Sequence, residues 1–111
     1  MLKIEQNNNI LIASFDKTDR FNAIIYQEVK DELNSLVIKP GANLILNLNG
    51  VNYIDSSGFG AMLSVYKTAR SNDNLFRICN VKEDVMDLIK LMKLDKVFDI
   101  YDSLSDCITS F

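Results

Sequence analysis

Apolar residues follow two different spacings along the chain, and the two spacings alternate. Short continuous or alternating apolar runs predict β-strands at residues 10–13, 44–48, 75–78 and 97–101. Between them, apolar residues recur at every third or fourth position, which predicts amphipathic helices over 21–37 and 81–92. Strands that alternate with helices need crossover connections, and these place the strands largely parallel. The sequence therefore predicts an α/β fold with a mixed, mostly parallel β-sheet and helices packed against it.

Polar residues beside these segments indicate where helices begin and end. Asn80, followed three residues later by Glu83, resembles a capping box for the helix over 81–92. Ser103 is predicted to cap a short last helix. No linker or internal repeat interrupts the pattern, so we expect one domain over residues 1–111.

The segment Asp55-Ser56-Ser57-Gly58-Phe59-Gly60 lies where the apolar strand at 44–48 gives way to a third amphipathic helix. A helix N-terminus has free backbone N–H groups and a partial positive charge, so it accommodates a hydroxyl or a phosphate well. One of the two serines can cap the helix, as serine often does. The second serine then needs another explanation.

This hexapeptide, with residues 44–48 before it and 62–67 after it, resembles the turn of the STAS family, the domain of bacterial anti-sigma factor antagonists. The resemblance extends over nearly the whole chain and implies a STAS-like single domain. In that family the second serine of the turn is phosphorylated by a partner kinase, which implies Ser57 as the phosphoacceptor here. We expect Ser57 to face outwards and Ser56 to face inwards.

The helix after the turn carries a stripe of small side chains. On a helical wheel, Phe59 and Met62 fall on the side assigned to the core, and the small and hydroxyl residues fall on the other side. Long charged residues are depleted from the centres of protein interfaces, so this second side is interpreted as a partner surface. The resemblance adds Asp19, an acidic residue ahead of the first helix, and Asp55, which can also form the turn itself. The predicted partner-binding residues are Asp19, Asp55, Ser56, Ser57, Gly58, Phe59, Gly60, Ala61, Ser64, Val65 and Thr68.

The resemblance implies an anti-sigma factor antagonist. Its unphosphorylated form would bind an anti-sigma factor serine kinase and release the sigma factor held by that kinase. Phosphorylation of Ser57 would switch binding off, and a phosphatase acting on phospho-Ser57 would restore it. Two alternatives are a STAS adaptor subunit of a lipid ABC transporter and a small-molecule-sensing STAS module.

Composition narrows the function further. The chain has no histidine, so a Ser-His-Asp triad cannot form within it, and no P-loop is present. Ser64 and Lys67 satisfy S-x-x-K, but the companion motifs of the enzymes that carry it are missing. We expect a protein that is not an enzyme and needs no cofactor or metal, with ATP and Mg²⁺ belonging to the kinase.

Charge and apolar run lengths bear on partners and location. The net charge is -3 and no dense Lys/Arg cluster occurs, which argues against nucleic acid as the main partner. No apolar run approaches the roughly 18 residues of a membrane span, so we expect no membrane insertion and a cytoplasmic location. Cys79 and Cys107 are predicted to be free thiols.

Overall fold

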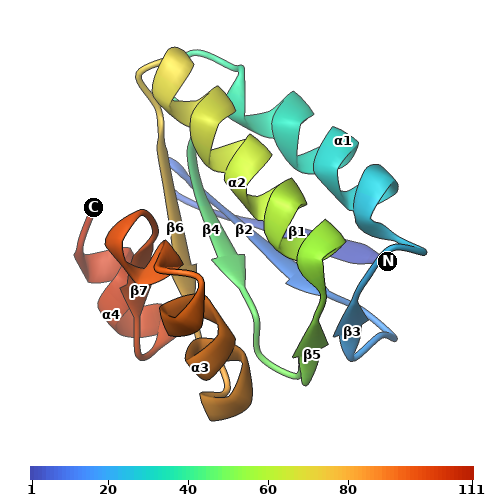
Figure 1. The fold of residues 1–111 in the computed structure, drawn as a ribbon. Helices are drawn as coiled ribbons and strands as arrows, with labels where there is room; N and C mark the ends of the chain where they lie inside the picture. Colours follow the sequence, from blue (N-terminus) through green and yellow to red (C-terminus); the bar gives the residue numbers. More distant parts are fainter.

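The computed structural model describes residues 1–111, and its elements follow one another in a βαβ pattern (Figure 1). In chain order they are β1 (Leu2–Asn7), β2 (Ile10–Phe15), β3 (Arg20–Phe21), α1 (Tyr26–Val37), β4 (Asn43–Asn47), β5 (Tyr53–Ile54), α2 (Ser56–Ser71), β6 (Leu75–Cys79), α3 (Glu83–Leu91), the 3-10 helix η1 (Leu94–Lys96), β7 (Asp99–Tyr101) and α4 (Leu104–Thr109).

Five strands form the main sheet in the order β1-β2-β4-β6-β7. β1 runs antiparallel to β2, and every other neighbouring pair is parallel. The antiparallel pair is a tight hairpin in which Asn7 is paired with Ile10 and Asn8 adopts a φ of 56°. Asparagine tolerates this left-handed conformation better than most residues, which explains its place in the turn. The predicted mixed, mostly parallel sheet is confirmed.

Helices cover both faces of this sheet. Figure 1 shows α1 and α2 side by side across one face, where they enclose the larger core with Leu44, Leu46 and Ile78. Alternate residues of the same strands, such as Ile45 and Cys79, point to the opposite face, and α4 covers them there. The central strands are therefore apolar on both sides, which is why they appear in the sequence as continuous apolar runs.

Cys79 and Cys107 lie together in the smaller core under α4 and are free, as predicted. Burial raises the pKa of the Cys79 thiol to about 12 and that of the Cys107 thiol to about 11. Both sulfurs therefore stay protonated at neutral pH and behave as small apolar groups.

The observed helix ends agree in part with those predicted from the sequence. The Ser103 hydroxyl accepts a hydrogen bond from the backbone N–H of Asp106 (3.1 Å), so the predicted cap of α4 is confirmed. The predicted capping box at Asn80 is wrong, because Asn80 adopts a φ of 58° and the N-cap residue of α3 is Lys82. The Asn80 side-chain amide instead donates to Asn47 Oδ1 (3.0 Å) and ties two strand ends together.

Helix α2 is buried on two sides, and this corrects the predicted partner surface. One side packs on the sheet, and the stripe of small residues is turned toward α1. Ala61 is only 3% exposed and Val65 is fully buried, while the Ser64 hydroxyl accepts a hydrogen bond from Asn34 Nδ2 of α1 (3.2 Å). Small side chains let two helices approach closely, so they explain helix packing here and not docking of a partner.

No helix of the structure combines the length and the apolar character needed to cross a membrane.

Candidate phosphorylation and partner-binding site

The turn between β5 and α2 is organised by the side chain of Asp55. Its Oδ1 accepts a hydrogen bond from the backbone N–H of Gly58 (3.0 Å), which makes Asp55 the N-cap of α2. Its Oδ2 accepts a second bond from the backbone N–H of Ala23 (3.0 Å), in the loop ahead of α1. The explanation that a serine caps this helix is therefore wrong, and both serine hydroxyls are left without a capping role.

Ser56 and Ser57 occupy the first two positions of α2. Ser56 is exposed and Ser57 is half-buried, the reverse of the exposure predicted from the sequence. Ser57 lies seven residues before Ser64 and so shares the flank of the helix that is turned toward α1. The more accessible of the two hydroxyls is therefore that of Ser56.

The surroundings of the two serines are favourable for an anion. The backbone N–H groups of Ser56 and Ser57 belong to the first turn of a 16-residue helix and have no partner within it. The helix dipole adds a partial positive charge at the same end. A phosphate on Ser56 would therefore be compatible with the folded chain.

A second, two-stranded sheet holds the loop of Asp19 against the segment that leads into this turn. β3 pairs in parallel with β5, and the backbone N–H of Asn52 donates to the carbonyl of Asp19 (2.8 Å). The Asp19 carboxylate is exposed and accepts a hydrogen bond from Asn52 Nδ2 (3.2 Å). Asn52 Oδ1 accepts in turn from Lys82 Nζ (2.6 Å). Asp19 thus lies beside Asn52 at the start of β5, and the turn at residues 55–58 follows the other end of that strand.

Gly58 marks the closest approach between the loop and the helix. A Cβ atom at this position would lie 2.5 Å from the carbonyl oxygen of Phe21 and 2.7 Å from Ile54 Cγ2. Neither atom can move away freely, since one is backbone and the other is in the core. The glycine is needed here because only a residue without a side chain fits.

Replacing Gly58 by Ala is therefore expected to destabilise the protein by about 1 to 3 kcal/mol, the usual cost of overpacking. Gly60 provides the matched control on the same helix, because its Cβ would meet no atom within 4 Å. Gly60→Ala should raise stability by up to about 1 kcal/mol through helix propensity. Urea denaturation of both variants checks the pair, and equal stabilities would show that the close approach at Gly58 is absent.

The structure divides the predicted partner-binding residues into three groups. Gly58, Phe59, Ala61 and Val65 are buried, so their assignment as direct partner contacts is wrong. Half-buried are Asp55, Ser57, Ser64 and Thr68. Exposed are Asp19, Ser56 and Gly60.

Sequence reasoning missed one exposed apolar residue beside the turn. The helix predicted over residues 21–37 has Ile24 among its regularly spaced apolar positions, which places this side chain on the buried face. The structure begins α1 only at Tyr26, and the Ile24 side chain is 88% exposed. The two-residue strands β3 and β5, which shift the helix start, are too short to give a periodic signal.

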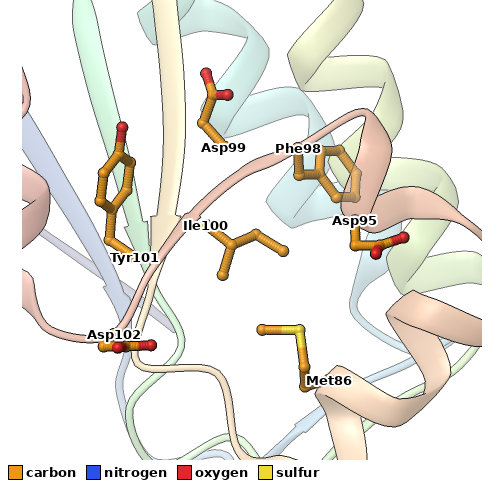
Figure 2. Close-up of a pocket in the computed structure, with 7 residues that line it drawn as sticks. All are labelled: Met86, Asp95, Phe98, Asp99, Ile100, Tyr101 and Asp102. Carbon is orange, nitrogen blue, oxygen red and sulfur yellow. The ribbon is translucent and has the colours of Figure 1, made fainter.

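A cavity of about 390 Å³ lies elsewhere, at the edge strand β7. Its lining residues, from α3, η1, β7 and the loops beside β7, are Met86, Asp95, Phe98, Asp99, Ile100, Tyr101 and Asp102. Figure 2 shows the Asp95 and Asp99 carboxylates pointing away from Ile100. The acidic groups do not converge, and the structure has no group of three or more His, Cys, Asp or Glu residues that could hold a metal ion.

Comparisons with known proteins agree with this fold. The STAS domain family model matches residues 1–107. The chain is 30% identical over 109 residues to the anti-sigma F factor antagonist of Paenibacillus polymyxa, covering 97% of this chain and 92% of that protein.

Two solved structures share the whole fold. The anti-sigma-factor antagonist (STAS) domain protein from Planctomyces limnophilus superposes with a TM-score of 0.90 at 13% identity, covering 98% of this chain and 96% of that one. Bacillus SpoIIAA in its phosphorylated form superposes with a TM-score of 0.73 at 11% identity, covering 99% and 98%. These similarities extend over nearly the full length of both chains in each comparison.

Proposed function

Since the chain belongs to the STAS domain family, we propose that it acts as an anti-sigma factor antagonist whose binding is controlled by phosphorylation in the turn at residues 55–58. The unphosphorylated protein binds an anti-sigma factor kinase in the cytoplasm, and the sigma factor held by that kinase is released. A phosphate on the turn ends the binding, and a phosphatase restores it. In this role the chain binds and accepts phosphate and catalyses no reaction.

The observation that supports this proposal best is the exposed, uncommitted hydroxyl of Ser56 at the first position of α2. A kinase must reach the acceptor oxygen, and Asp55 frees that oxygen by taking the capping role itself. We therefore assign the phosphoacceptor to Ser56 in place of Ser57, which is half-buried. The full-length match to an antagonist supports this function over a transporter adaptor.

The phosphoryl transfer requires only the Ser56 hydroxyl from this chain. The Ser56 oxygen attacks the γ-phosphorus of ATP held by the kinase, ADP leaves, and the hydroxyl proton is released. The product adds a charge of about -1.5 to -2 at pH 7. The helix end tolerates this charge, so the fold is retained, while a partner surface docked on the turn meets new charge and bulk.

Phosphorylation by the kinase should place a single phosphate on Ser56. Each anti-sigma factor kinase of the source organism is incubated with ATP and the purified protein, and the phosphate is located by peptide mass spectrometry. Ser56→Ala should block the reaction and Ser57→Ala should permit it. A phosphate located on Ser57, or full modification of Ser56→Ala, would reject the assignment.

A further inference from the structure

Ile24 has the most exposed of the large apolar side chains, with 88% of its surface accessible. A single exposed apolar residue is common on protein surfaces and needs no explanation by itself. Leu91, the last residue of α3, is 77% exposed and is such a residue. The position and the rigidity of Ile24 are what distinguish it.

The backbone around Ile24 is held in place on both sides. Phe21 is fully buried before it, and its ring packs at 5.1 Å from that of Phe15. Asn22 Oδ1 accepts a hydrogen bond from the N–H of Ile24 (3.1 Å), and the Asn22 carbonyl accepts one from Tyr26 (2.9 Å). The apolar side chain is thus presented to solvent by a fixed loop, so little further ordering is needed when a partner covers it.

Asp55 connects this loop to the phosphorylatable turn. Its Oδ2 accepts from the N–H of Ala23, while its Oδ1 caps α2 through Gly58. Ile24 follows Ala23 in the chain and Ser56 follows Asp55, so each is adjacent to one end of the same 3.0 Å hydrogen bond. Ile24 and the Ser56 hydroxyl are therefore presented by one rigid unit.

We propose that Ile24 is the apolar anchor of the interface with the anti-sigma factor kinase, and that Asp55 is the positioning residue that holds Ile24 beside Ser56. The inference rests on the proposed function, because its occupant is the partner named there. The kinase surface must then offer an apolar pocket next to the groups that receive Ser56. Apolar anchors in well-packed pockets carry much of the affinity of protein interfaces.

Calorimetric titration of the kinase that phosphorylates Ser56 tests the anchor. Ile24→Ala should weaken binding by about tenfold or more, and the matched control Leu91→Ala should bind as the wild type does. Both variants should melt at the wild-type temperature because both side chains are exposed. Wild-type affinity for Ile24→Ala would overturn the anchor and leave the proposed function intact. If the wild-type protein binds none of the organism's anti-sigma factor kinases, the proposed function fails, and the anchor fails with it.

A double-mutant cycle tests the positioning role of Asp55. Asp55→Asn leaves one acceptor oxygen for two N–H donors, so it should weaken binding in the wild-type background and speed hydrogen exchange of the Ala23 amide. In the Ile24→Ala background the same change should alter affinity by less than about twofold, because the group it positions is gone. An equal loss of affinity in both backgrounds would show that Asp55 does not act through Ile24.

Discussion

Ala61→Glu is expected to lower the melting temperature by about 10 to 20 °C. Ala61 is 3% exposed and lies on the side of α2 that faces α1, so a glutamate side chain there would enter the packed contact between the two helices. Burying an unpaired carboxylate typically costs about 3 to 5 kcal/mol of folding free energy. The cost arises either from the desolvated charge itself or from the displacement of the helix that would expose it to water. Circular dichroism melts of the purified variant provide the measurement.

Lys67→Glu is the matched control for Ala61→Glu. It places the same side chain on the exposed face of the same helix, where substitutions usually change stability by under about 0.5 kcal/mol. If Ala61→Glu melts within a few degrees of Lys67→Glu, then α1 does not pack on this side of α2.

Ala61 also shows why the partner surface could not be predicted from the sequence. A helical wheel gives the angles between side chains, but it cannot show how many neighbours a helix has. The stripe that includes Ala61 and Ser64 is equally compatible with a partner protein and with α1 of the same chain. Small side chains favour close approach in both cases, and only the three-dimensional arrangement distinguishes them.

Local chemistry was predicted better than long-range contacts. The change from strand to helix at Asp55 and the cap at Ser103 depend on residues near in sequence, and the structure confirms both. The bond from Ala23 to Asp55 and the pairing of β3 with β5 join segments more than thirty residues apart. Neither leaves a periodic signal, so the exposure of Ile24 was missed.

The second large effect is expected from charge on Ser56. Ser56→Asp should weaken binding of the anti-sigma factor kinase by at least about thirtyfold, because an unpaired charge buried in an interface costs about 2 kcal/mol or more. The fold should not suffer, since a carboxylate in the first turn of a helix is stabilising by about 0.3 to 1 kcal/mol. Melting temperature and affinity should therefore change in opposite directions, as circular dichroism and calorimetry can measure.

Ser57→Asp is the control for that substitution. It adds the same charge one residue further along, on the half-buried flank toward α1. We expect it to cost more stability than Ser56→Asp and to disturb the partner surface less directly. A larger loss of affinity in Ser57→Asp than in Ser56→Asp, at equal stability, would contradict the assignment of the switch to Ser56.

The most direct measurement is a calorimetric titration of the purified anti-sigma factor kinase with this protein before and after stoichiometric phosphorylation, with the position of the phosphate verified by mass spectrometry. The unphosphorylated protein should bind, and the protein carrying phosphate on Ser56 should bind at least about thirtyfold more weakly while keeping its circular dichroism spectrum. Equal affinity of the two forms would contradict phosphorylation of the turn as the switch.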